Sequence, residues 1–120
     1  MDQNDLKTRA TLWIESWNTR DLGKIMDHYA DDVELCSPFV VDRWQLAEGR
    51  INGKDKLKDH FVKAFSSGAV NNLELVDFLA GVHDFILLYK DSKGVMSADL
   101  VELNDAGKVK TVKSFYTKNE

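Results

Sequence analysis

The sequence has few of the residues that stabilise small extracellular or metal-dependent domains. Cys36 is the only cysteine among 120 residues, so we expect no internal disulfide and a reducing, cytoplasmic environment. The three histidines and this cysteine lack the spacing of a metal site, so we expect no metal. There is no glycine-rich phosphate loop and no dinucleotide-binding fingerprint, and we therefore expect no cofactor.

Long apolar runs and a strong excess of one charge are also missing. No apolar stretch approaches about 18 residues, so we expect no transmembrane helix, and the polar segment 1–7 is not typical of a secretory signal. Lys and Arg number 16 against 20 Asp and Glu, which gives a formal net charge of −4. Without a basic block, we expect neither nucleic acids nor membrane surfaces as partners.

The composition that remains is that of a globular protein. Hydrophobic residues make up 43% of the chain and charged residues 30%. A chain of this length is typical of one domain, which we place over residues 1–120. It can bury roughly two-thirds of its unfolded surface, so it needs no disulfide or metal to fold.

The first half of the chain has the apolar spacing of three helices. The first covers residues 6–19, the second covers 22–30 after a cap at Asp21, and the third follows a cap at Asn52 and ends at Gly68. Their apolar positions are Leu6, Ala10, Trp13, Ile14 and Trp17, then Leu22, Ile25, Met26, Tyr29 and Ala30, then Leu57, Phe61, Ala64 and Phe65. Between the second and third helices we expect a short strand ended by Pro38 and then a loop over 39–52.

The second half has the two-residue period of strands. Four are predicted, at Leu73–Ala80, Phe85–Lys90, Val95–Leu103 and Val109–Tyr116. The short turns between them require antiparallel neighbours, because a parallel crossover needs a dozen or more residues. The sequence therefore predicts an α+β domain with three N-terminal helices packed on a curved, mostly antiparallel sheet.

One predicted strand, 85–89, is apolar on both of its faces. On the next strand Met96, Ala98 and Leu100 alternate with residues of the opposite face. Large exposed apolar patches usually mark interfaces, so we expect a homodimer through the outer face of the sheet. The alternative is an ordinary sheet with a few exposed apolar side chains.

Several short motifs follow one another along the chain, and their order and spacing are informative when they are taken together. They are Trp17-Asn18-Thr19-Arg20-Asp21-Leu22, Tyr29-Ala30-Asp31-Asp32-Val33-Glu34, Ser37-Pro38, Gly53-Lys54-Asp55 and Asp105-Ala106-Gly107-Lys108-Val109. From about residue 6 to 116 the chain thereby resembles the nuclear-transport-factor-2-like superfamily, the cystatin-like α+β cone, and within it the SnoaL-like and ketosteroid-isomerase-like branch. The resemblance implies a cone-shaped half-barrel whose apolar pocket, between sheet and helices, holds a small hydrophobic molecule.

The resemblance also implies site residues. Ketosteroid isomerase uses one Asp as a base and a second, neutral Asp with a Tyr as oxyanion donors. The oxyanion Asp corresponds to Asp99, whereas the base corresponds to Ser37 and the Tyr to Trp13. Because two of these three roles are lost, we do not expect the isomerisation of steroids itself.

Asp99 and His60 are the candidate catalytic residues. If the face of the strand that carries Asp99 points inward, burial raises the pKa of the carboxyl and makes it an acid or base near neutral pH. If that face points outward, Asp99 is a structural carboxylate. His60 lies at the edge of the third helix's apolar stripe, where it can act with Asp99 or bind Ser37, or simply lie at the boundary with solvent.

The candidate ligand-binding residues are mostly aromatic. They are Trp13, Trp17, Ser37, Phe39, Trp44, Phe61 and Tyr116. Helical spacing of Trp13 and Trp17 is also typical of plain core, whereas Trp44 lies in the predicted loop and can close the pocket mouth. Two functions follow: an acid–base enzyme of the isomerase, cyclase or hydrolase type, or a non-catalytic ligand-binding or dimerisation module with the same fold.

Overall fold

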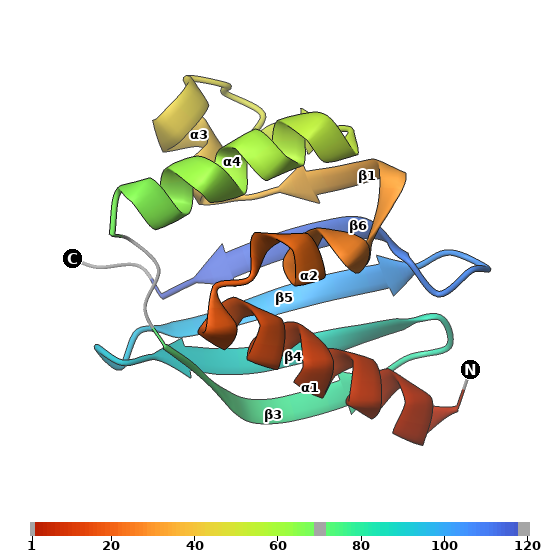
Figure 1. Cartoon of the computed structure of the whole chain (residues 1–120). Coiled ribbons are helices and arrows are strands. Elements are labelled where there is room, and N and C mark those ends of the chain that lie inside the picture. The colour runs from red at the N-terminus through yellow and green to blue at the C-terminus, as the bar shows by residue number, and fades with distance from the viewer. Residues whose placement is uncertain (1, 69–71, 118–120) are drawn as a thin grey trace.

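The computed structural model describes residues 2–68 and 72–117, where helices cover one side of a mixed six-stranded sheet (Figure 1). The described helices are α1 (Gln3–Thr19), α2 (Leu22–Asp27), α3 (Pro38–Trp44) and α4 (Lys54–Ser66). The described strands are β1 (Tyr29–Cys36), β2 (Arg50–Asn52), β3 (Leu73–Ala80), β4 (Asp84–Asp91), β5 (Met96–Leu103) and β6 (Val109–Tyr116).

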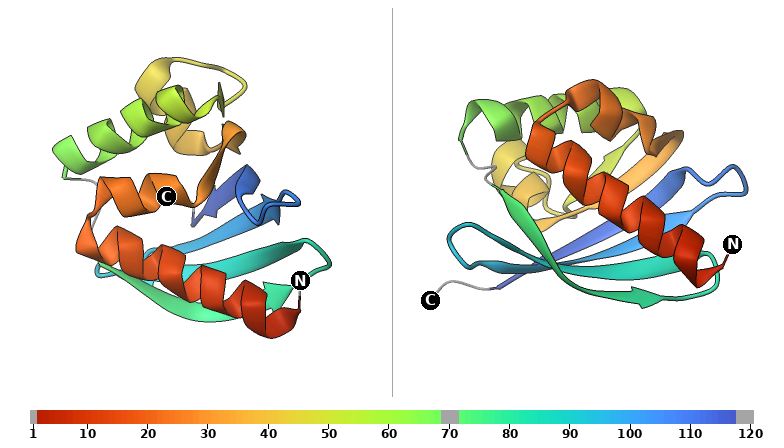
Figure 2. Two further views of the ribbon diagram at one scale, coloured as in Figure 1. Left: turned by 45° about the vertical axis from the view of Figure 1, so that its right-hand side comes forward. Right: turned by 60° about the horizontal axis from the view of Figure 1, so that its bottom comes forward.

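The sheet has the strand order β2-β1-β6-β5-β4-β3. The meander from β3 to β6 is antiparallel throughout, as its short turns predict, and among the described strands only β1 and β6 pair in parallel. Two further views show the sheet curving beneath α1, α2 and α4 (Figure 2). The sheet does not close, and the predicted α+β cone-shaped half-barrel is confirmed, with a fourth helix added.

The second helix is shorter than its apolar spacing predicts. Asp21 caps α2 as expected, since its carboxylate accepts a hydrogen bond from the Lys24 amide at 3.1 Å. The helix nevertheless ends at Asp27, and Tyr29 and Ala30 are buried in β1. Tyr29 pairs with Val109 of β6, so tertiary strand pairing outweighs a helical pattern of only a few residues.

The prediction of a loop over 39–52 is wrong, because most of this segment forms a helix and a strand. Pro38 does end β1, but it also starts α3, because proline fits the first helical turn. Ser37 is the N-cap of α3, and its hydroxyl accepts a hydrogen bond from the Phe39 amide at 3.2 Å. The segment then returns as β2, which pairs with β1.

The start of α4 also differs from the prediction. Asn52 lies in β2, and Gly53 precedes the helix with a φ of 96° and without a side-chain cap. The left-handed region suits glycine here, whereas Asn52 is held by its pairing with Glu34. The other end agrees with the prediction, because Gly68 adopts a φ of 72° just after α4.

The inner face of the sheet packs on the helices and forms the core. On β5 the inward residues Ser97, Asp99 and Val101 are buried, whereas Met96 and Leu100 remain 40% and 37% exposed on the outer face. The outward direction expected for Met96 and Leu100 is therefore confirmed, and of the two alternatives for Asp99 the structure has the inward one. Along residues 2–68 and 72–117, every helix is too short or too polar to span a bilayer.

Candidate functional site

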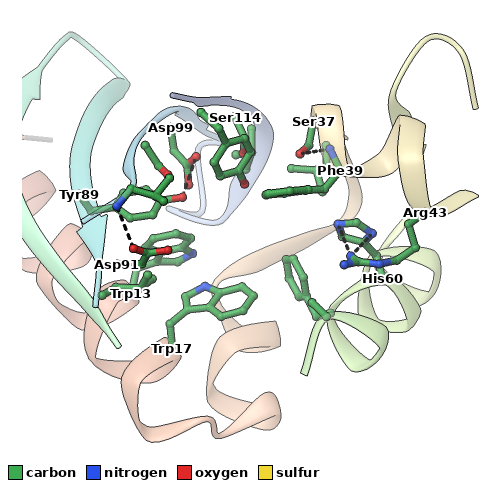
Figure 3. A pocket seen from close by; sticks show the side chains of 18 of the residues that line it. Trp13, Trp17, Ser37, Phe39, Arg43, His60, Tyr89, Asp91, Asp99 and Ser114 are labelled. Atoms are coloured by element: carbon green, nitrogen blue, oxygen red, sulfur yellow. Dashed lines mark hydrogen bonds between the residues drawn. The ribbon is translucent and has the colours of Figure 1, made fainter. Parts of the chain in front are cut away.

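A cavity of about 180 Å³ lies between the inner face of the sheet and helices α1, α3 and α4 (Figure 3). Eight of the nine predicted site residues line it: Trp13, Trp17, Ser37, Phe39, His60, Phe61, Asp99 and Tyr116. Trp44 does not. Aromatic and other apolar side chains form much of the wall, and in Figure 3 Asp91 and Asp99 lie on one side of the cavity while Arg43 and His60 lie on the other.

Ring contacts hold the aromatic walls in place. Trp17 packs edge-on against Phe61, with ring centroids 4.8 Å apart, and lies 5.9 Å from Trp13. On the other side, the rings of Phe39 and Tyr116 are 4.4 Å apart. Such contacts favour a fixed apolar slot that excludes water from a bound molecule.

Asp99 lies in the wall of this cavity, in the middle of β5. Its residue is 2% exposed, and the Tyr89 hydroxyl donates a hydrogen bond to Asp99 Oδ1 at 3.2 Å. Burial raises the pKa of Asp99 from 3.8 to about 7, although hydrogen bonds from Ser114 and Tyr89 act in the opposite direction. Among the described residues, no Lys or Arg forms an ion pair with this carboxyl.

Two tyrosines accompany Asp99. Burial, followed by the nearby Asp99 charge, raises the pKa of Tyr116 to about 12 and that of Tyr89 well above its ordinary value. Both hydroxyls therefore stay protonated at neutral pH and can donate hydrogen bonds. Tyr89 is not among the predicted site residues, although its alternation with Phe85 and Leu87 on one face of β4 was a signal for it.

Two further polar residues in the wall were not predicted as site residues. The Tyr29 hydroxyl accepts a hydrogen bond from Trp13 Nε1 at 2.9 Å, which fixes the Trp13 ring. Ser114 lies opposite Asp99 on β6. Tyr29 was assigned to a helix and Ser114 carries no distinctive pattern, so only the observed strand pairing brings them to the cavity.

Trp17 contributes an unused donor to the cavity. Its indole nitrogen is buried and forms no hydrogen bond of good geometry among the described residues, although the Tyr29 hydroxyl lies near enough to interact with it weakly. In Figure 3 this nitrogen is on the side of the ring that faces the cavity. A buried N–H without an acceptor is costly, so the site suits a molecule that brings an oxygen to it.

His60 lies away from Asp99, on the α3–α4 side of the cavity (Figure 3). It is 5% exposed, so it does not lie at the boundary with solvent. Its Nδ1 accepts a hydrogen bond from Trp44 Nε1 at 3.0 Å, which places the ring proton of the neutral imidazole on Nε2. Burial and then the Arg43 charge lower the pKa of His60 to about 4.

The predicted pairings of His60 with Asp99 or Ser37 are not formed. The hydrogen-bond partners of His60 within the described segments are Trp44 and Arg43. Ser37 is buried, and its hydroxyl caps α3, so it supplies no base in the cavity.

Trp44 has a different place from the one predicted. It ends α3, because residues 38–44 are helical rather than an open loop. Its indole contacts His60, and the Lys63 ammonium lies 4.1 Å from the centre of its ring. Trp44 therefore positions His60 from behind the wall and does not close the mouth of the cavity.

Known proteins support this architecture. No protein-family profile matches the chain, and no curated protein matches it in sequence. Among solved structures, a SnoaL-like protein of unknown function from Burkholderia thailandensis is 26% identical, with a TM-score of 0.91 over 98% of this chain and 99% of that one. An NTF2-like protein of unknown function from Burkholderia pseudomallei is 16% identical, with a TM-score of 0.76 over 98% and 92%.

A third similar structure contains a named small molecule. TerC, co-crystallized with polyporic acid, is 14% identical, with a TM-score of 0.73 over 92% of this chain and 89% of that one. At this identity the likeness concerns the fold alone.

Proposed function

We propose that this chain, which has the cystatin-like fold of SnoaL-like and NTF2-like proteins, binds a small hydrophobic carbonyl compound and moves a proton on it through Asp99. The observation that carries the proposal is a fully buried carboxyl in a cavity, without a cationic partner among the described residues and with a pKa of about 7. This is the chemistry of an isomerase or cyclase that works without a cofactor.

The proton transfer needs only this one carboxyl. Near pH 7 both forms of Asp99 are populated, so the carboxylate takes a proton from the carbon next to the substrate carbonyl and becomes the acid. Where the substrate has a carbon–carbon double bond beside that carbon, the enolate is a conjugated dienolate, and the acid form returns the proton to its far carbon. No electrons leave the substrate, and the net result is an isomer. Tyr89 holds the carboxyl in place through its hydrogen bond.

The developing enolate oxygen requires hydrogen-bond donors. Trp17 Nε1 is buried and forms no hydrogen bond of good geometry within the described chain, and the Tyr116 hydroxyl, which interacts with Ser37, Ser114 and Tyr89, stays protonated at neutral pH. Both residues line the cavity. Donors fixed before the reaction stabilise such a charge without reorganisation, most strongly where water is excluded.

A second candidate function is ligand binding without catalysis. Two observations favour it. Position 37 is a serine whose hydroxyl caps α3, and the acceptor nitrogen of His60 already accepts a hydrogen bond from Trp44, so neither residue assists Asp99 as a second base. TerC, with its polyporic acid, is a precedent for a small molecule bound to a protein of this fold. In this case Asp99 and Trp17 only orient the ligand.

Hydrogen–deuterium exchange separates the two functions without knowledge of the substrate. Cyclohexanone is incubated in D₂O with the protein, and loss of its α-proton signal is followed by NMR. We expect exchange above the buffer rate that rises with pH through about 7, because the carboxylate is the base.

Two variants test whether the exchange depends on Asp99. Asp99→Asn should abolish the protein-dependent rate, whereas Asp105→Asn, which removes the same charge from an exposed turn, should leave it unchanged. Binding without exchange would favour the non-catalytic module. An exchange rate that is equal in wild type and Asp99→Asn would refute the role of Asp99.

A further inference from the structure

Arg43 is a charged residue of the cavity wall that the proposed proton transfer does not use. It lies near the end of α3 and is only partly exposed. The only hydrogen-bond contacts of its guanidinium within the described chain are with the His60 ring, at 3.3 Å from Nδ1 and 3.5 Å from Nε2. Among the described residues no carboxylate pairs with it.

His60 cannot accept the hydrogen bonds that the Arg43 guanidinium can donate. The imidazole is neutral at pH 7, and its one acceptor atom, Nδ1, already accepts a hydrogen bond from Trp44. A guanidinium carries five N–H donors in a planar fork that matches a carboxylate. Arg43 and the Nε2–H of His60 therefore form a donor-only group in the cavity wall.

The charges of the cavity are arranged with opposite signs at its two sides. In Figure 3, Asp91 and Asp99 lie on the side of β4 and β5, and Arg43 lies on the side of α3 and α4. The Asp91 carboxylate accepts hydrogen bonds from the Lys93 and Val95 amides, each at 2.9 Å, at the turn after β4. An anionic ligand group is thus repelled from the first side and attracted to the second.

The volume of the cavity limits the size of the ligand. A cavity of roughly 150 Å³ lined by apolar side chains holds one benzene ring. The cavity here, of about 180 Å³, accommodates a six-membered ring with small substituents within its walls, whereas a fused polycycle would extend out of its open side.

We infer that the ligand is a single-ring carboxylic acid that also carries a ketone, with its carboxylate on Arg43 and the carbon next to its ketone facing Asp99. The inference rests on the proposed function, because it names the ligand class of the same cavity. It makes Arg43 the residue that sets specificity and orientation, and it leaves the proton transfer to Asp99.

The test compares two probes of equal size. These are 4-oxocyclohexane-1-carboxylate and its neutral primary amide, with binding measured by titration calorimetry at pH 7. A charge-assisted contact with Arg43 should make the carboxylate bind about tenfold or more tightly than the amide.

Three variants test whether the preference for the carboxylate depends on Arg43. Arg43→Gln should remove the preference, and Arg43→Lys should keep part of it, because lysine retains the charge without the planar fork. Lys58→Gln, which removes a positive charge from the exposed face of α4, should leave it intact. Circular dichroism checks that each variant is folded, and Arg43→Lys remains informative if Arg43→Gln is not.

The outcomes separate the two proposals. Equal affinities for acid and amide, or a preference that survives in Arg43→Gln, would overturn the role of Arg43. Failure of both probes to bind would also overturn it. In each case Asp99-dependent exchange on cyclohexanone would still support the proposed function, whereas loss of that exchange alone would refute the proton transfer.

Discussion

Replacing Asp99 by asparagine should make the protein more stable at high pH. The substitution keeps the size of the side chain and its capacity to accept a hydrogen bond from Tyr89, but it removes the ionisable group. In the wild type, ionising a carboxyl that is 2% exposed opposes folding. The asparagine variant has no such cost at any pH.

The sign and size of the effect follow from the pKa of Asp99, which is 3.8 when unperturbed and about 7 in the folded protein. Below pH 4 the carboxyl is protonated in both states and folding is not penalised. Between pH 4 and 7 the unfolded chain loses the proton first, so the free energy of unfolding falls as pH rises. At about 1.4 kcal/mol per pH unit, tapering near each pKa, the loss between pH 5 and pH 8 is about 3 kcal/mol.

Urea unfolding at pH 5, 6, 7 and 8 measures this difference. The free energy of unfolding of Asp99→Asn minus that of the wild type should grow by about 3 kcal/mol from pH 5 to pH 8. Asp105→Asn, a change at an exposed turn, is the matched control and should show no such growth. A constant difference between Asp99→Asn and wild type across this range would refute the buried-carboxyl argument.

Two other predictions concern His60 and the outer face of the sheet. Arg43→Gln removes one of the two causes that lower the pKa of His60. The midpoint of the His60 NMR titration should therefore rise from about 4 but remain below 6.5, because burial persists. An unchanged midpoint would refute the electrostatic contact. We also propose a homodimer through the outer face, where Met96, Leu100 and Phe115 are 40%, 37% and 55% exposed. Sedimentation at micromolar concentration should give about twice 13.7 kDa, and Leu100→Lys should give a monomer; a monomeric wild type would contradict this interface.

The strand meander was predictable from its two-residue period and its short turns. The direction of Asp99 was not, because both faces of β5 carry apolar residues, and only packing on the helices shows that the face of Asp99, Val101 and Leu103 is buried. The long helices α1 and α4 were likewise predictable, since their apolar stripes extend over several turns.

Short segments were not predictable in this way. Tyr29 fits a helical spacing and also a strand, and only its pairing with β6 decides between them. Residues 38–44 form α3, which begins at Pro38, and a proline that ends a strand does not by itself show that a helix starts there. Arg43 was missed because the segment was assigned to a loop, where a single arginine carries no signal for a cavity wall.

The most direct test of the account is the titration of the Asp99 carboxyl itself. Its ¹³C chemical shift can be followed by NMR from pH 4 to pH 9, with Asp99→Asn used to assign the signal. We predict a midpoint near 7, because burial in the cavity disfavours the charged form. A midpoint near 4 would mean that Asp99 is solvated, and would contradict both the buried acid and the proton transfer built on it.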